Sequence, residues 1–309
     1  MQRGKFLDLV VCGPDMSGTS TQIKYLINFF KVNGMKVRDI RGTEIEALFH
    51  TEPFKKFNEN LTHLSDLSEE RKKDFLLEAY YLMSGGRREG DLAVASSVKN
   101  DISTYLNPDS ADVWIMEEPT KRGAGQVNRA IEQNRSDYGE KMDPYSAAVT
   151  HSVYRIDEFL RFRKIFREKN KIIVRSRSEE SACYQIYDKE NLSKGILPKD
   201  YLSLPGHKFA FGNSPTDLFI VSGPKDWTQK DYLELKEKRS KGRKLDNHEK
   251  NSSYQVLVNK RYATNWIENL YLEGTKMHGG KMPNFERFNI YDSEEAINRK
   301  MAEKISFIL

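Results

Sequence analysis

The stretch that decides the fold is FLDLVVCGPDMSGTSTQIKYLINFF, residues 6–30. It opens with a short apolar run from Phe6 to Cys12, which is typical of a buried strand in a parallel sheet. A loop rich in glycine and serine follows. Apolar residues then recur at i, i+3, i+4 and i+7 from Ile23 to Phe30, which predicts one buried helix face. Residues 36–40 predict a second strand, so the opening is a strand–loop–helix–strand unit of an α/β fold.

The rest of the chain continues this alternation. Further strands are predicted at 113–116, 171–174, 217–221 and 288–291, with helices at 144–169 and around 297–305. Such a pattern predicts one three-layer α/β/α domain over residues 1–309, with a central parallel sheet and a helical insertion at about 45–110. Ligands bind at the carboxyl ends of parallel strands, so we expect the site where the loops after Cys12, Met116 and Val174 converge.

Composition excludes several classes of protein. Hydrophobic residues make up 38% of the chain and charged residues 31%, and Lys plus Arg outnumber Asp plus Glu by 50 to 45. No apolar run approaches the roughly 20 residues that span a bilayer, so we expect a cytoplasmic protein without a membrane partner. The basic run at 235–250 lacks interleaved aromatic residues, and we do not expect nucleic acid as a partner. Cys12 and Cys183 fall in predicted core segments and are expected to be reduced structural thiols.

The loop between the first strand and helix has a phosphate-binding pattern. Residues 13–21 read GPDMSGTST and fit G-x-x-x-x-G-x-[ST]. The backbone N–H groups of such a loop and the following helix N-terminus bind phosphate, and the hydroxyl at the place of Ser20 binds Mg²⁺. Thr19 stands where the motif expects a lysine that reaches the β- and γ-phosphates. Catalysis at this loop would therefore need a cation from elsewhere in the chain.

Several motifs, in order along the chain, resemble those of the thymidylate kinase family of P-loop kinases. DMSGTSTQ at 15–22 is similar to that family's phosphate loop, in which some members also carry threonine for lysine. EEPT at 117–120 resembles its R-E-P-T loop, Tyr154-Arg155 its D-R helix, SACYQ at 181–185 its S-S-x-A-Y-Q motif, and DLFIV at 217–221 its P-D-L strand. The resemblance covers nearly the whole chain except about 45–110 and part of 186–213, and the shared order of the motifs carries it.

The resemblance implies a P-loop NTPase fold and a function. The expected protein is a transferase that uses ATP and Mg²⁺ to phosphorylate a deoxynucleoside monophosphate. The first candidate acceptor is dTMP, converted to dTDP in dTTP biosynthesis. It also implies a homodimer. Two alternatives remain: a kinase for a different nucleoside monophosphate, and a non-catalytic nucleotide-binding homologue.

Site residues follow by position from the same resemblance. The donor phosphates are expected to contact the phosphate loop, with Ser20 also holding the metal: Gly13, Ser17, Gly18, Thr19, Ser20 and Thr21. The acceptor is expected to contact seven residues: Asp15, Glu118, Pro119, His151, Arg155, Tyr184 and Gln185. Arg155 would hydrogen-bond the acceptor base. His151, four residues earlier on the same helix face, would stack on that base.

Two arginines are candidates for the cation that replaces the missing lysine. Where the family carries D-R, this chain reads VRSRS at 174–178. Strict register places Arg175 on the aspartate and Ser176 on the arginine, whereas a one-residue slip places Arg177 on the arginine. Either arginine could supply the positive charge. The expected catalytic residues are therefore Asp15, Arg175 and Arg177.

Other cations are candidates in two further places. Residues 186–213 have the position of the lid that closes over the phosphates in this family. They contain no arginine, so Lys199 or Lys208 is expected to supply charge there. The arginine of the family's R-E-P motif is Glu117 in this chain, and Arg41 is a rival candidate for its role.

Overall fold

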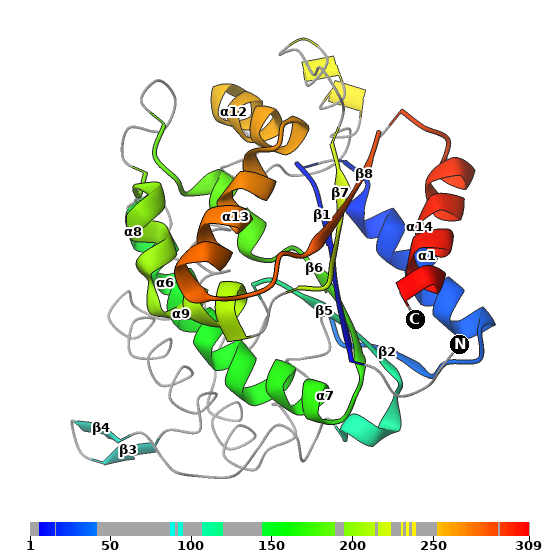
Figure 1. Cartoon of the computed structure of the whole chain (residues 1–309), viewed down its shortest axis with the longest axis horizontal. Helices are drawn as coiled ribbons and strands as arrows, with labels where there is room; N and C mark the ends of the chain where they lie inside the picture. The colour runs from blue at the N-terminus through cyan, green and yellow to red at the C-terminus, as the bar shows by residue number, and fades with distance from the viewer. Residues whose placement is uncertain are drawn as a thin grey trace, which may run out of the picture.

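The centre of the molecule is a six-stranded sheet with the strand order β2-β5-β6-β1-β7-β8 (Figure 1). The structure is a computed structural model that describes residues 6–15, 17–41, 87–89, 92–94, 107–119, 144–188, 195–213, 216–223, 230, 233–234, 237–238, 252–289 and 291–308. Every neighbouring pair in the sheet is parallel. The strands are β1 (Leu7–Cys12), β2 (Val37–Asp39), β5 (Val113–Glu117), β6 (Ile172–Ser176), β7 (Leu218–Ser222) and β8 (Asn284–Phe288).

Helices cover both faces of the sheet and complete a three-layer α/β/α arrangement. Helices α1 (Thr19–Val32) and α14 (Glu294–Ile308) lie side by side on one face (Figure 1). The other face is covered by a long helix that runs from α6 (Pro144–Glu158) through a π-helical turn, η4 (Phe159–Arg163), into α7 (Lys164–Glu168), and by shorter elements. These are η5 (Glu179–Tyr184), α8 (Pro198–Ser203), α9 (Pro205–Lys208), η6 (Phe209–Asn213), α12 (Ser252–Ala263) and α13 (Trp266–His278).

The central strand β1 contributes side chains to two hydrophobic cores, one on each face of the sheet. Leu7, Leu9 and Val11 belong to the core under α1 and α14, whereas Val10 and Cys12 belong to the core on the opposite face. Side chains of a strand alternate between the two faces of a sheet, so Asp8 lies on the same face as Val10. Asp8 is completely buried there. This charged residue inside the core forms ion pairs with two buried arginines, Arg163 and Arg175.

The last strand was predicted in the wrong place. The sequence pattern indicated 288–291, but β8 spans Asn284–Phe288 and pairs with β7, while Tyr291 is 62% exposed. The reason is that β8 is an edge strand with charged residues. Arg287 pairs with Glu268 of α13, and Glu286 pairs with Lys304 of α14. These ion pairs replace the apolar pattern that marks the buried strands.

Most of the helical insertion predicted at about 45–110 lies outside the described residues. Within it, β3 (Arg87–Glu89) and β4 (Leu92–Val94) form an antiparallel pair, and η3 (Pro108–Ser110) is a 3₁₀ turn that leads into β5. Cys12 and Cys183 are both buried and free. In the described part of the chain, no helix is long and apolar enough to cross a membrane.

Candidate functional site

The loop after β1 brings a helix N-terminus to the carboxyl edge of the sheet. Gly18 has φ +90°, a left-handed conformation that glycine adopts without a Cβ clash, and α1 begins at the next residue. No side chain caps this end of α1 among the described residues. The first N–H groups of a helix have no partner within the helix and attract anions, so the local geometry suits a phosphate group.

The loop also lies tightly against the end of β7. A Cβ built at Gly13 would overlap the carbonyl oxygen of Ser222 and the Oγ atom of Ser17, so this close approach requires glycine. Ser17 is buried, Thr19 is half-buried, and Ser20 and Thr21 are exposed on the first turn of α1. Met16 lies outside the described residues.

Arg177 lies at this loop. Its guanidinium donates a hydrogen bond to Oδ1 of Asp15, and Gln255 of α12 donates to Oδ2 of Asp15 at 2.9 Å. The guanidinium carbon is 5.3 Å from the centre of the Tyr184 ring, a cation–π geometry. Arg177 has φ +70°, which is unfavourable for a residue with a Cβ. The surrounding contacts therefore hold this arginine beside the phosphate loop at a conformational cost.

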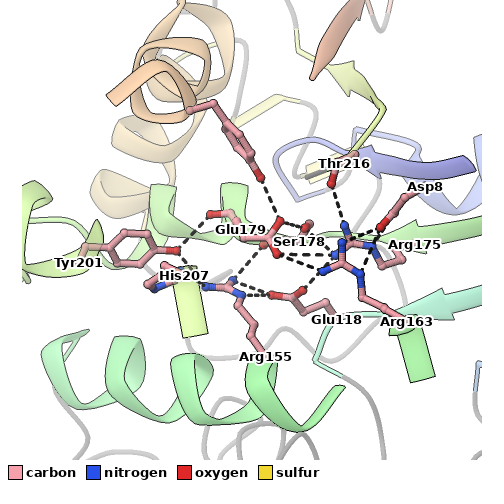
Figure 2. A network of polar contacts seen from close by, with 11 residues as sticks. Asp8, Glu118, Arg155, Arg163, Arg175, Ser178, Glu179, Tyr201, His207 and Thr216 are labelled. Atoms are coloured by element: carbon pink, nitrogen blue, oxygen red, sulfur yellow. Dashed lines mark hydrogen bonds and ion pairs between the residues drawn. The ribbon is translucent and has the colours of Figure 1, made fainter. Parts of the chain in front are cut away.

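Arg175 points into the interior. It donates to Asp8 at 2.9 Å, to Ser178 Oγ at 2.7 Å and to Thr216 Oγ1 at 2.8 Å. Arg163 contacts the same aspartate at 2.6 Å (Figure 2). Asp8 lies four residues before the end of β1, about 13 Å along the strand from the phosphate loop. Of the two candidate arginines, the structure brings Arg177 and not Arg175 to that loop.

Arg155 is fully engaged by protein groups. It donates twice to Glu118 Oε1, at 2.8 and 2.6 Å, and once to the Ser178 carbonyl oxygen at 3.2 Å. The remaining bonds go to Tyr201 Oη at 3.0 Å and His207 Nδ1 at 3.2 Å (Figure 2). A guanidinium has five N–H donors, and these contacts use all five. Recognition of an acceptor base by Arg155 would require some of them to be exchanged.

Arg155, Arg163 and Arg175 form one buried polar network with three carboxylates. The carboxylates belong to Asp8, Glu118 and Glu179, and all three are 5% exposed or less. Burial would raise the pKa of Glu179, but Arg175, Arg163 and Arg155 outweigh it and hold that pKa below the ordinary range. Burial and the neighbouring Arg155 lower the pKa of His207. This histidine is therefore neutral and accepts a hydrogen bond from Arg155.

The other predicted acceptor residues lie around this network. His151 is 2% exposed and stands edge-on to Tyr154, with ring centres 6.5 Å apart. Pro119 is buried directly after Glu118, and the peptide bond between them is cis. Gln185 is buried at the end of η5, where its N–H donates to the Ala182 carbonyl oxygen at 3.0 Å.

The described part of the predicted lid is packed against α6. The N–H of Gly206 donates to Ser152 Oγ at 2.8 Å, and a Cβ at this glycine would overlap the Ser152 carbonyl oxygen. Tyr201, His207 and Phe211 are completely buried. Lys199 and Lys208 are exposed on α8 and α9, which lie beside α6 and away from the start of α1 (Figure 1). The structure therefore does not bring these two lysines to the phosphate loop.

Arg41, the other candidate for the role of the arginine in the R-E-P motif, is also distant from the phosphate loop. Arg41 pairs with Asp39 at 2.7 Å at the end of β2. This edge strand is three strands away from β1, about 14 Å across the sheet. Glu117 is the half-buried last residue of β5.

A magnesium ion would have few protein ligands at this site. No group of three or more His, Cys, Asp and Glu side chains that could hold a metal ion occurs in the described ranges. Mg²⁺ that accompanies a nucleotide needs only one or two protein oxygens, because phosphates and waters complete its octahedron. The exposed Ser20 hydroxyl at the first turn of α1 fits that requirement.

Sequence reasoning missed several residues of these clusters. Asp8 gave a signal, since it interrupts an apolar strand and a buried charge needs a partner. Its partners Arg163 and Arg175 become recognisable only when the strand and helix are placed together. Glu179 and Gln255 carry no motif, and only the structure connects them to the site.

No family model matches the chain, and no curated protein matches it.

Proposed function

We propose that this chain is a P-loop phosphotransferase of the nucleoside-monophosphate kinase type. Its donor is ATP with Mg²⁺, and its acceptor is a deoxynucleoside monophosphate, with dTMP as the first candidate. The observation that carries the proposal is the pairing of an uncapped helix N-terminus with the nearby Arg177, which Asp15 and Tyr184 hold at the loop. By resemblance to thymidylate kinases, we also propose a cytoplasmic homodimer.

Each residue at the loop has a role in this proposal. The backbone N–H groups of Gly18 and Thr19, at the N-terminus of α1, bind the donor phosphates. The Ser20 hydroxyl binds Mg²⁺, which neutralises charge on the phosphate oxygens. Arg177 supplies the cation that Thr19 cannot, and Asp15 orients the acceptor. Phosphoryl transfer depends mainly on positioning and charge neutralisation, so one well-placed guanidinium can replace the absent lysine.

A second candidate is a nucleotide-binding protein without kinase activity. Three observations favour it: Thr19 at the lysine position, Arg175 turned into the interior, and Arg155 with all five donors engaged. A third possibility keeps the kinase chemistry but changes the acceptor base. It is favoured by His151, which is buried against Tyr154.

The deciding experiment measures ADP release from ATP and Mg²⁺ with each deoxynucleoside monophosphate in turn. Turnover on dTMP supports the first proposal, and turnover on another acceptor changes only the base. Arg177→Ala is expected to lower turnover about 100-fold, the usual effect of removing one transition-state donor. Arg299→Ala on the exposed side of α14 is the matched control and should leave turnover unchanged. Nucleotide binding without any turnover would support the non-catalytic candidate, and absence of nucleotide binding would contradict all three candidates.

A further inference from the structure

Helix α12 directs a row of polar side chains into the interior. Gln255, Asn259 and Tyr262 are spaced at i, i+4 and i+7, so they share one face of the helix, and each is 2% exposed or less. Each also has a buried polar atom with no hydrogen-bond partner among the described residues: Gln255 Oε1, both amide atoms of Asn259 and Tyr262 Oη. Buried polar atoms in native proteins are nearly always bonded, so this row is suited to a hydrogen-bonding ligand.

Asn259 is the clearest case in this row. Among the described residues it is the only buried amide side chain in which neither the oxygen nor the nitrogen has a partner. Leaving such a group unpaired lowers stability, whereas the preceding residue, Val258, is an apolar side chain that is completely buried in the core. A carboxamide presents one donor and one acceptor side by side, and asparagine binds nucleobase edges through such a pair of hydrogen bonds.

Contacts on either side of the row fix the position of α12. Tyr254 Oη donates to the carbonyl oxygen of Tyr184. At the other end of the helix, Arg261 donates to the carbonyl oxygens of Cys183 at 2.8 Å and Ile186 at 2.9 Å. Because the helix is anchored at both points, the row keeps its orientation, and its unpaired atoms are a fixed feature of the fold.

The row starts at the phosphate loop. Gln255 Nε2 donates to Asp15 Oδ2 at 2.9 Å, and Arg177 donates to the other carboxylate oxygen of Asp15. Asn259 lies one helical turn further along α12, about 5.4 Å. The side chains of Asp15 and Arg177 are 13% and 33% exposed, whereas the row is buried. A ligand would therefore reach the row from the side of this ion pair and separate the two side chains as it enters.

We propose that Asn259 determines specificity by binding the base edge of the acceptor nucleotide with its carboxamide. The inference rests on the proposed function, in which Asp15 orients the acceptor beside the phosphate loop. The amide N–H donates to a ring carbonyl oxygen and the amide oxygen accepts from a ring N–H, a pair of groups that thymine presents side by side. The row carries no charge, which fits a neutral base and not a phosphate. Arg155, whose five donors are engaged by protein groups, keeps a structural role.

The first test measures dTMP binding to the full chain by titration calorimetry. Asn259→Leu replaces the amide by an apolar group of similar shape and should weaken dTMP binding about tenfold, while ATP with Mg²⁺ binds unchanged. N3-methyl-dTMP, which lacks the ring N–H, should bind the wild type more weakly than dTMP does, but should bind Asn259→Leu as well as dTMP does. Removal of the sugar hydroxyl, as in 3′-deoxy-dTMP, should have the same effect on both proteins. An equal loss on N3-methylation in both proteins would overturn the inference.

Thermal melting without nucleotide separates ligand binding from a structural role. If the Asn259 amide supported the fold, Asn259→Leu would melt below the wild type. The inference predicts a melting temperature at or above that of the wild type, because an unpaired buried amide is removed. Asn269→Leu, at an exposed asparagine of α13, is the matched control. It measures the gain from the helix propensity of leucine and should bind dTMP as the wild type does.

The outcomes separate this inference from the proposed function. A wild type that binds ATP but not dTMP, dTMP binding that Asn259→Leu leaves unchanged, or a lowered melting temperature of Asn259→Leu would overturn the inference. If the wild type binds neither nucleotide, the proposed function fails as well.

Discussion

Glu179 and Glu180 are consecutive residues of η5, and both are almost completely buried. Burial raises the pKa of each carboxyl, but three arginines overcome it at Glu179, whereas at Glu180 burial outweighs the opposing charge of Arg177. At neutral pH the first is therefore ionised and the second protonated. The charge state of a buried carboxyl depends on its partners, and the pair EE in the sequence gives no sign of this difference.

At the residue scale, the protonation of Glu180 predicts how stability depends on pH. Its pKa rises from the ordinary 4.5 to about 8 on folding, so the folded state binds the proton more tightly than the unfolded state. The contribution of Glu180 to the free energy of unfolding is complete below pH 4.5. It is lost as the pH rises towards 8, by at most ~1.4 kcal/mol per pH unit. Glu180→Gln should remove this loss. Urea unfolding of both proteins at pH 5 and pH 8 measures it, and the same pH dependence in both would contradict the assignment.

The phosphate loop gives a second prediction at the same scale. Thr19→Lys restores the residue that the motif expects at the start of α1, where an ammonium group can reach the phosphates. We expect ATP with Mg²⁺ to bind about tenfold more tightly, because one charge-assisted hydrogen bond is worth ~1.5–3 kcal/mol. Asn28→Lys adds the same charge on the exposed side of α1 and should change affinity little. Calorimetry compares the three proteins. Equal affinities would show that residues 13–21 do not bind the donor phosphates.

At the element scale, the sequence predicted buried strands well and exposed or irregular elements poorly. The strands β1, β5, β6 and β7 are nearly continuous apolar runs, and their pattern is visible without a structure. The edge strand β8 depends on ion pairs with other elements, and its predicted position was wrong. Residues 186–213 were predicted as a lid from their position in the family resemblance, and the structure describes 195–213 of them. The buried residues Tyr201, His207 and Phe211 are spaced irregularly because the chain there forms three short helices.

The contact between α9 and α6 gives the prediction for this scale. Gly206 approaches the backbone of Ser152 so closely that any Cβ would overlap it. Gly206→Ala should therefore force the two helices apart and destabilise the fold by roughly 1–3 kcal/mol. Lys208→Ala on the exposed side of the same helix should have almost no effect. Chemical denaturation measures both. An unchanged Gly206→Ala variant would mean that the segment after residue 195 is not packed as an integral layer on α6.

At the scale of the whole molecule, the polar network joins elements that are far apart in sequence. Asp8 belongs to β1, Arg175 to β6 and Arg163 to the long helix, and Glu118 directly follows β5 (Figure 2). The glycine loop and the helix start at residues 13–21 could be predicted from the local sequence pattern, and their role in binding phosphate stays a prediction. The contacts of Arg155 and Arg175 were not predictable, because whether an arginine faces a ligand or a buried carboxylate depends on partners tens of residues away.

Asp8 provides a test of how much this network contributes to the fold. Its carboxylate pairs with Arg163 at 2.6 Å and with Arg175 at 2.9 Å, and it is completely buried. Asp8→Asn leaves two buried guanidinium groups without their shared anion. Removing one partner of a buried ion pair costs ~3–5 kcal/mol, which lowers the melting temperature by roughly 10 °C for a chain of this size.

The matched control is Asp109→Asn, because Asp109 pairs with Lys169 and Lys171 on the surface and is 60% exposed. This substitution should leave the melting temperature nearly unchanged, since exposed ion pairs contribute little. Calorimetric melting of wild type and both variants makes the comparison. If Asp8→Asn melts at the wild-type temperature, the two arginines do not depend on Asp8, and the interior of this face is solvated or rearranged. If it melts much lower in a single transition, the network links β1, β6 and the long helix into one cooperative unit. The Arg155 guanidinium, bonded within the same network, is then held by the fold itself, and under the proposed function the acceptor is recognised by residues nearer the phosphate loop.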